Sequence, residues 1–178
     1  MRIAIGADHR GAEAYTLVRT LLVQLGHEVR DSGGCPDNTP CDYPDRAYPV
    51  AQDVATGAAD RGILICGSGI GMCMTANKVK AVRAAQVHDE VSAEMSRRHN
   101  DANVLCLPAD MLGRRIIERI VKTWLRSPFD GGRHARRLAK IAAIEQGLDP
   151  STVVNPPPAE GVELQSPNHA GPDPAPTV

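Results

Sequence analysis

Aromatic residues are scarce in this chain, which holds three tyrosines, one phenylalanine and one tryptophan among 178 residues. Proteins that bind single-stranded nucleic acid stack bases on such side chains and carry an excess of positive charge. Here 20 lysines and arginines balance 21 aspartates and glutamates, for a formal net charge of -1. We therefore expect no nucleic-acid partner and a small molecule as the ligand.

Long hydrophobic runs and a signal peptide are missing as well. No apolar stretch approaches the ~20 residues that a membrane-spanning helix needs, and the chain enters a short apolar strand at once. These features predict a cytoplasmic protein with no membrane partner. The cysteines are odd in number and show no CxxC spacing, so the sequence indicates neither a disulfide framework nor a zinc site; they are Cys35, Cys41, Cys66, Cys73 and Cys106.

Short apolar runs, which predict strands, alternate with segments whose apolar residues recur at helical spacing. The predicted strands cover residues 2–7, 27–31, 62–66, 82–87 and 104–107. The predicted helices are a segment ending at Gly26, one that carries Val50 to Ala55, and about 70–78, 89–98, 111–125 and 133–146. This order predicts an α/β fold, with a Rossmann-like, doubly wound sheet of five parallel strands and helices on both faces.

Composition divides the chain into two parts. Residues 1–147 carry all of the predicted elements and form one domain. From residue 150 onward, eight of twenty-nine residues are proline and apolar periodicity is nearly gone. Such a segment buries too little apolar surface to offset its ordering entropy. We therefore predict a disordered, proline-rich tail over residues 148–178.

Cys66 is the residue that points most directly to chemistry. It ends the apolar run 62–66 and is followed by Gly67-Ser68-Gly69-Ile70-Gly71, where a strand gives way to a helix. Backbone N–H groups at such a turn, with the positive end of the helix dipole behind them, stabilise a thiolate or a developing oxyanion. A base and an anion hole would thus share one loop, although a cysteine at a strand end can also be a small buried hydrophobe.

Topology assigns the other polar candidates to two edges of the sheet. Ligands of parallel sheets bind beyond the carboxyl ends of the strands. Asp8 and His9 follow the first strand and should lie at the same edge as Cys66. His99 and Asn100 precede the fifth strand and should lie at the opposite edge, so a second subunit would have to supply them.

The known motifs of several cofactor-binding and hydrolase sites are each incompatible with particular residues of this chain. The turn 6–11 lacks the dinucleotide fingerprint, and Ala12-Glu13 replace the Lys and Ser/Thr of a P-loop. Met72 stands where a Cys-x5-Arg phosphatase needs arginine, and Ser68 lacks the flanking glycines of a hydrolase elbow. We predict no cofactor and no metal.

Several segments together resemble ribose-5-phosphate isomerase type B and its sugar-phosphate isomerase relatives. The resemblance covers roughly residues 1–147, and its motifs stand in the family's order. They are GADHRG at 6–11, DYP at 42–44, GILICGSGIG at 62–71, ANK at 76–78, SRRHNDAN at 96–103 and GGRH at 131–134.

The resemblance implies a cofactor-free aldose–ketose isomerase that interconverts D-ribose 5-phosphate and D-ribulose 5-phosphate through an ene-diolate. Cys66 would be the base, His99 would help open the sugar ring, and Arg133 and Arg137, four apart on one helix, would grip the phosphate. The implied substrate-binding residues are Asp8, His9, Gly67, Ser68, Gly69, Ile70, Gly71, Asn100, Arg133 and Arg137. Family members are homodimers or homotetramers whose sites borrow residues from a neighbour.

One departure leaves the substrate open. Asp110 stands where relatives usually carry a substrate-contacting arginine. Either Arg114 or Arg115 compensates, or the substrate is placed differently. The alternatives are an isomerase of allose, galactose or tetrulose phosphates, a non-catalytic sugar-phosphate-binding protein, or a hydrolase with Cys66 as nucleophile. Cys73 and Cys106 are expected in the core, and His134 is a weaker site candidate.

Overall fold

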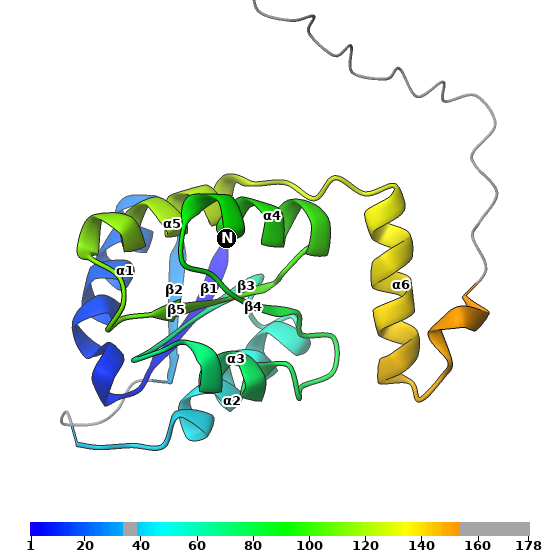
Figure 1. The fold of residues 1–178 in the computed structure, drawn as a ribbon. Coiled ribbons are helices and arrows are strands. Elements are labelled where there is room, and N and C mark those ends of the chain that lie inside the picture. Colours follow the sequence, from blue (N-terminus) through cyan, green and yellow to red (C-terminus); the bar gives the residue numbers. More distant parts are fainter. Residues whose placement is uncertain (34–38, 154–178) are drawn as a thin grey trace, which may run out of the picture.

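Five parallel strands form the centre of the molecule (Figure 1). This computed structural model describes residues 1–33 and 39–153. The strands are β1 (Arg2–Ala7), β2 (Glu28–Gly33), β3 (Arg61–Cys66), β4 (Ala84–Gln86) and β5 (Val104–Pro108). They form one sheet in the order β2-β1-β3-β5-β4, and every pairing is parallel. The predicted Rossmann-like α/β fold with a five-stranded parallel sheet is therefore confirmed.

Helices connect the strands close to the predicted positions. They are α1 (Ala12–Gln24), α2 (Tyr43–Ala55), α3 (Ile70–Ala76), α4 (Glu90–Asn100), α5 (Arg114–Arg126) and α6 (Arg133–Glu145), with 3-10 turns η1 (His9–Gly11) and η3 (Pro150–Thr152). The predicted start of α5 at Met111 is wrong, because the Met111 N–H closes a turn onto the Pro108 carbonyl and the helix begins after Gly113. Asp89 caps α4, as predicted, through a reciprocal bond with Ser92.

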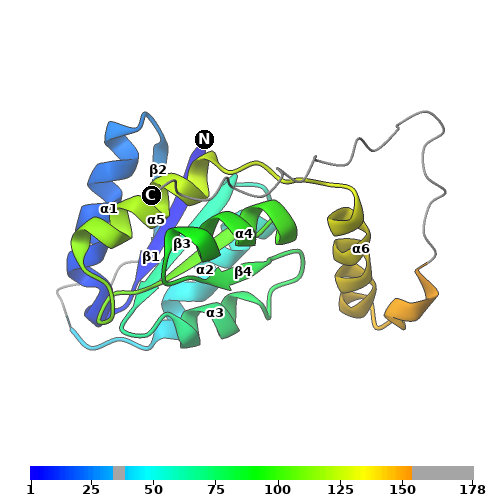
Figure 2. The ribbon, with the colours of Figure 1, turned by 45° about the horizontal axis from the view of Figure 1, so that its top comes forward.

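The core lies in two layers, one on each face of the sheet. Alternate strand residues point to opposite faces, so Ile63 and Ile65 pack with α1, α4 and α5, whereas Leu64 and Cys66 pack with α2 and α3. Figure 2 shows the same division, with α2 and α3 on the side away from α1, α4 and α5. Helices on both faces explain why the central strands are apolar throughout.

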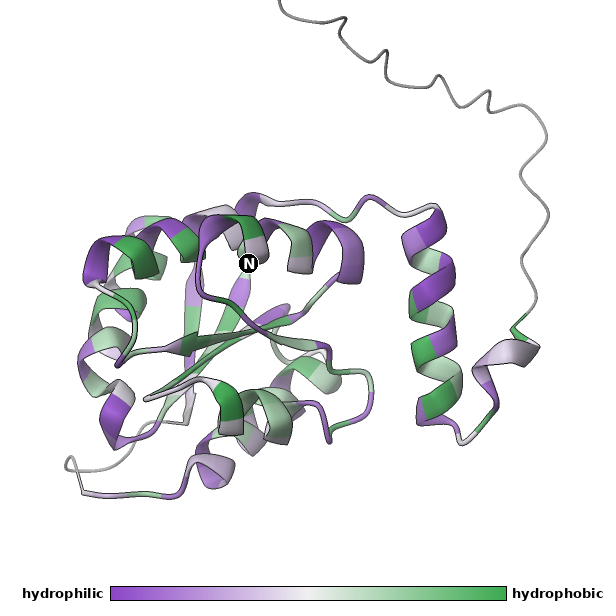
Figure 3. Ribbon diagram, in the orientation of Figure 1, coloured by the Kyte–Doolittle hydropathy of each residue, from purple (hydrophilic) through white to green (hydrophobic). Residues whose placement is uncertain are grey.

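Helix α6 stands apart from this body in both views (Figures 1 and 2). It contacts α4 and η3, and its amphipathic surface is visible in Figure 3. Ile141 and Ile144 are 40% and 59% exposed. With Val82, Ala84 and Ala85 at the β4 edge, they line a groove of about 420 Å³. One chain alone therefore leaves an apolar surface of α6 uncovered.

The segment after α6 begins with a short ordered turn. Lys140 Nζ donates a hydrogen bond to the Pro150 carbonyl at 3.0 Å, which ties η3 to α6. The rest of the predicted tail, residues 154–178, lies outside the described residues. Among the helices that the structure describes, none combines the length and the apolar character needed to cross a membrane.

The cysteines differ from one another more than the sequence suggested. Cys66, Cys73 and Cys106 are free thiols, whereas Cys41 is disulfide-bonded. The expectation of no disulfide, drawn from the odd number and the spacing of the cysteines, is wrong at Cys41, because number and spacing do not determine which side chains meet in the fold. Cys35 lies outside the described residues.

Candidate active site

Residues 66–71, here called the thiol loop, place backbone donors around a buried sulfur. Cys66 ends β3 and is 4% exposed. Its Sγ accepts a hydrogen bond from the Gly69 N–H at 3.1 Å. Gly69 has a φ of +75°, in the left-handed region that favours glycine, and this turn is what brings its N–H back to the sulfur. The Ile70 N–H donates to Ser68 Oγ at 3.4 Å.

The carbonyl groups of the thiol loop are bound to the neighbouring strands. Gln86 Nε2 donates to the Ser68 carbonyl from β4. The Ala109 N–H donates to the Cys66 carbonyl at 2.8 Å, and the Asp110 N–H donates to the Gly67 carbonyl at 3.0 Å. These bonds hold the loop's acceptors to the sheet, so a ligand over the loop meets mainly N–H groups. Such an arrangement suits an anion.

Asp8 and His9 lie at the same edge of the sheet, as predicted. The Asp8 N–H donates to the Ile65 carbonyl at 3.2 Å, which sets η1 beside the end of β3. The Asp8 carboxylate accepts from the N–H groups of Arg10 and Gly11 at 2.9 and 3.1 Å. It is therefore the cap of η1 as well as a site candidate. His9 is exposed, and its Nδ1 accepts from the Cys41 N–H at 3.4 Å.

Tyr43 lines one side of this site and was not among the site residues predicted from the sequence. Its ring lies so close to Gly71 that a Cβ at position 71 would be 2.6 Å from two ring carbons. Tyr43 opens α2 and is 42% exposed. Its place in the DYP segment that carries the family resemblance was the available signal.

A second set of candidates gathers where α4 meets α6, and we call it the α6 cluster: His99, Asp130, Arg133, His134 and Arg137. The rings of His99 and His134 stack with centroids 4.2 Å apart and planes within 4°. Both oxygens of Asp130 accept from Arg98 Nε, at 3.1 and 3.2 Å. Arg133 and Arg137 are exposed on α6. Asp130 was not predicted from the sequence and His134 was only a weaker site candidate, because only folding brings them to His99.

Electrostatics favours the neutral imidazole at His134. Burial lowers the pKa of His134 below its ordinary 6.5, and the positive charges of His99, Arg133 and Arg137 lower it further. Ligand atoms of His99, Asp130 and His134 lie within 4.8 Å of one another, the one such group of metal-capable side chains among the described residues. Because Arg98 already holds both Asp130 oxygens, a cation would have to compete with a guanidinium for them.

The thiol loop and the α6 cluster lie at opposite edges of the sheet, as predicted for Cys66 and His99. Cys66 is paired with Pro108, and Gly62 with Val104. The Gly62 N–H donates to the Asn103 carbonyl at 2.9 Å, just beyond the end of α4. Between these two levels β3 rises roughly 13 Å, at about 3.3 Å per residue. One chain therefore cannot bring His99 to Cys66.

Two further thiols lie behind the thiol loop. Cys106 is fully buried, and burial raises the pKa of its thiol well above the ordinary value. Cys73, on α3, is only partly buried, and a hydrogen bond with Cys106 lowers its pKa to about 7. The prediction of a core position is confirmed for Cys106, whereas Cys73 lies at the margin of the core.

Known proteins share both the sequence and the fold. A sequence profile of the ribose/galactose isomerase family matches residues 3–141. A D-erythrulose-4-phosphate isomerase from Pectobacterium atrosepticum is 41% identical over 145 residues, which cover 82% of this chain and 95% of that relative. The structure of ribose-5-phosphate isomerase B from Clostridium thermocellum is 45% identical and superposes with a TM-score of 0.81 over 83% of this chain and 99% of the other.

A second solved structure is that of ribose-5-phosphate isomerase B from Mycoplasma genitalium with bound ribulose 5-phosphate. It is 40% identical, with a TM-score of 0.75, and the match covers 82% of this chain and 96% of the other. The chain therefore belongs to the ribose/galactose isomerase family and is a sugar-phosphate isomerase.

Proposed function

We propose that this isomerase interconverts D-ribose 5-phosphate and D-ribulose 5-phosphate, with Cys66 as the base. The observation that carries the proposal is the hydrogen bond from the Gly69 N–H to Cys66 Sγ at 3.1 Å. A thiolate there is stabilised by a backbone donor before substrate arrives. The bound ribulose 5-phosphate in the Mycoplasma genitalium relative supports the choice of substrate.

The chemistry is a proton transfer between neighbouring carbons. Cys66 takes the proton from C2 of the open-chain aldose, which leaves an ene-diolate, and the same thiol returns the proton to C1. The negative charge that develops on oxygen is met by the N–H groups of Gly67 to Gly71. Ser68 Oγ, on the same loop, exchanges the proton between the two substrate oxygens. No net oxidant or cofactor is needed.

A homo-oligomer completes the site in this proposal. A second copy brings its α6 cluster to the thiol loop, so that His99 opens the sugar ring and Asn100 binds the reacting oxygens. Arg133 and Arg137 then hold the phosphate. The exposed apolar face of α6 and the separation of the two half-sites across the sheet both support this assembly.

Isotope incorporation tests the reaction directly. The enzyme is incubated in deuterium oxide with pentose, tetrose and hexose phosphates, and label at C1 or C2 is read by NMR. We expect label in the pentose phosphates at the highest rate. A protein that only binds sugar phosphates would incorporate no label, and a hydrolase that uses Cys66 as nucleophile on these substrates would release the free sugar and then inorganic phosphate from a phosphocysteine.

Mixing two inactive variants tests the shared site. Cys66→Ala and His99→Asn are each expected to be inactive, since each removes one half of every site. After subunit exchange, a mixed dimer has one site with both residues intact, so equimolar mixing should restore about a quarter of wild-type activity. Absence of any recovery, in a mixture shown by native mass spectrometry to contain hybrids, would contradict the shared site.

A tetrulose phosphate is the second candidate substrate. The Pectobacterium relative, a D-erythrulose-4-phosphate isomerase, is 41% identical to this chain. The substrate panel separates the candidates by their ratios of kcat/KM, because both reactions use the same proton transfer.

A further inference from the structure

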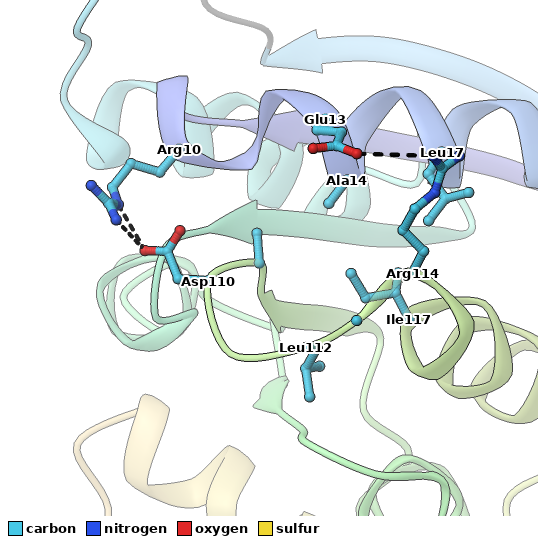
Figure 4. A pocket seen from close by; sticks show the side chains of 10 residues that line it. Arg10, Glu13, Ala14, Leu17, Asp110, Leu112, Arg114 and Ile117 are labelled. Carbon is cyan, nitrogen blue, oxygen red and sulfur yellow. Dashed lines mark hydrogen bonds and ion pairs between the residues drawn. The ribbon is translucent and has the colours of Figure 1, made fainter.

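Arg10 and Asp110 form an ion pair (Figure 4), and this pair lies against Gly67 of the thiol loop. Arg10 Nε donates to Asp110 Oδ2 at 2.7 Å, and Arg10 Nη2 lies 2.6 Å from the same oxygen. A Cβ at Gly67 would be 2.5 Å from Asp110 Oδ2 and 2.8 Å from Arg10 Nε. The pair thus covers the backbone of the residue next to Cys66, and only glycine leaves room for it.

Backbone hydrogen bonds fix both partners relative to Cys66. Arg10 follows β1 in η1, which is held by the Asp8 carboxylate and by the bond from Asp8 to Ile65. Asp110 follows β5, and its N–H donates to the Gly67 carbonyl at 3.0 Å. The guanidinium therefore has a defined position at the carboxyl edge of the sheet, one residue away from the base.

Arg10 can still bind an anion while it is paired with Asp110. Its side chain is 59% exposed, and that of Asp110 is 41% exposed. Such exposed pairs add little to stability. Both contacts of the guanidinium, from Nε and Nη2, go to one carboxylate oxygen, so Nη1 has no partner among the described residues. A guanidinium that donates hydrogen bonds to a carboxylate along one side can still donate from its other N–H groups to a phosphate.

The position also fits the phosphate end of the substrate. The Cys66 side chain packs with α2 and α3, whereas the Arg10–Asp110 pair lies against the position that a Cβ on Gly67 would take. A group bound by Arg10 would therefore lie to one side of the sulfur and not over it. The phosphate on C5 of a pentose, three carbons away from C2, is the anionic group of the substrate that suits this position.

The other arginines near this pocket are arranged differently. Arg114 lines the same cavity of about 250 Å³ but faces Glu13, with 3.9 Å between Nη1 and Oε1 (Figure 4). The cation beside Asp110 is Arg10, which was not among the two arginines, Arg114 and Arg115, that the sequence offered as compensation for Asp110. Sequence spacing favoured the next turn, whereas the sheet brings the β1 and β5 ends together.

We propose that Arg10, held by Asp110, binds the phosphate group of the substrate. The inference deepens the proposed function and rests on it for the identity of the sugar. Asp110 keeps the guanidinium in place and cancels its surplus charge, while Arg10 prevents the carboxylate from repelling the phosphate.

The test compares Arg10→Gln with the matched variant Arg114→Gln. We expect Arg10→Gln to raise KM for ribose 5-phosphate about 10- to 100-fold, as the loss of a charged hydrogen bond does, with little change in kcat. The inhibition constant of inorganic phosphate should rise by a similar factor. Arg114→Gln should leave both constants near wild type, and Arg10→Lys should fall between the two.

Two outcomes would overturn the inference. One is a wild-type KM in Arg10→Gln, and the other is a raised KM with unchanged phosphate inhibition, which would place Arg10 on the sugar instead. Calorimetric titration with inorganic phosphate keeps the question separate from the proposed reaction. If the wild type isomerises nothing, the proposed function fails, yet weaker phosphate binding by Arg10→Gln than by Arg114→Gln would still support the inference. Thermal midpoints verify that each variant is folded.

Discussion

The thiol loop and the α6 cluster, which we propose as the two halves of a site shared between subunits, are built in opposite ways. In the thiol loop Cys66, Gly67 and Gly69 are buried, and the carbonyls of residues 66–68 are bound to β4 and to the segment just after β5. The α6 cluster lies where α4 meets α6, and α6 is a helix that stands away from the body, with exposed arginines and an exposed apolar face (Figure 1). Preorganised hydrogen-bond donors are most effective in a rigid site that excludes water, whereas charged side chains can bind a phosphate at a subunit interface.

This difference predicts which step of the reaction a substitution in each region affects. Changes in the thiol loop alter geometry within one chain and should affect the chemical step. Changes at Arg133 and Arg137 of the α6 cluster remove charges that, in the proposed oligomer, hold the phosphate in a second copy's site, so they should affect substrate binding first.

Replacing Cys66 by alanine should have the largest effect. Removing a general base costs about 10²- to 10⁴-fold in rate, so kcat should fall by that range while ribose 5-phosphate still binds. Cys106→Ala is the matched control, since Cys106 is a thiol buried in the same cluster. Steady-state kinetics and calorimetry distinguish them, and a Cys66→Ala enzyme with normal kcat would exclude the thiol as base.

Replacing Arg137 by alanine should raise KM rather than lower kcat. Loss of a charged hydrogen bond to phosphate predicts a KM increase of about 10- to 100-fold. Arg136→Ala is the control, because Arg136 is equally a surface residue of α6 but is not among the charges that act on His134. Equal effects of the two variants on KM would contradict a specific phosphate contact on this helix face.

Replacing Gly69 by alanine should reduce both stability and kcat. A residue other than glycine in the left-handed region costs roughly 1–2 kcal/mol, and the new Cβ would also be 3.2 Å from Gln86 Cγ. Gly57→Ala carries the same backbone cost, with φ +74° and open space around it. Both variants should lose stability in denaturant unfolding, but only Gly69→Ala should lose activity.

The pH dependence of stability should show the smallest effect. His134 has a folded pKa below its ordinary 6.5, so its contribution is present above that pH and is lost as the pH falls through it. His27 behaves alike, because burial and the N-terminal charge lower its pKa. Unfolding midpoints should therefore decline between pH 7 and 5.5. His134→Gln should flatten part of the decline and His27→Gln another part; a full slope in His134→Gln would contradict the lowered pKa.

Periodicity and local chemistry were enough to predict much of this protein. The alternation of apolar runs with helical spacing predicted the five parallel strands, and the glycines after Cys66 predicted a turn with donors near a thiol. These features depend on neighbours in the chain, whose geometry is set by backbone sterics and strand alternation. Chain order along the sheet also predicted that Cys66 and His99 lie at opposite edges.

Only the tertiary structure decided which distant residues meet. His134 stacks on His99, Tyr43 packs on Gly71, and Arg10 rather than Arg114 pairs with Asp110. Each contact joins segments far apart in the sequence, and its partner is chosen by strand order and by the direction in which a helix leaves the sheet. Because many side chains of suitable type compete for each such contact, composition and spacing cannot select among them, and the packed fold does.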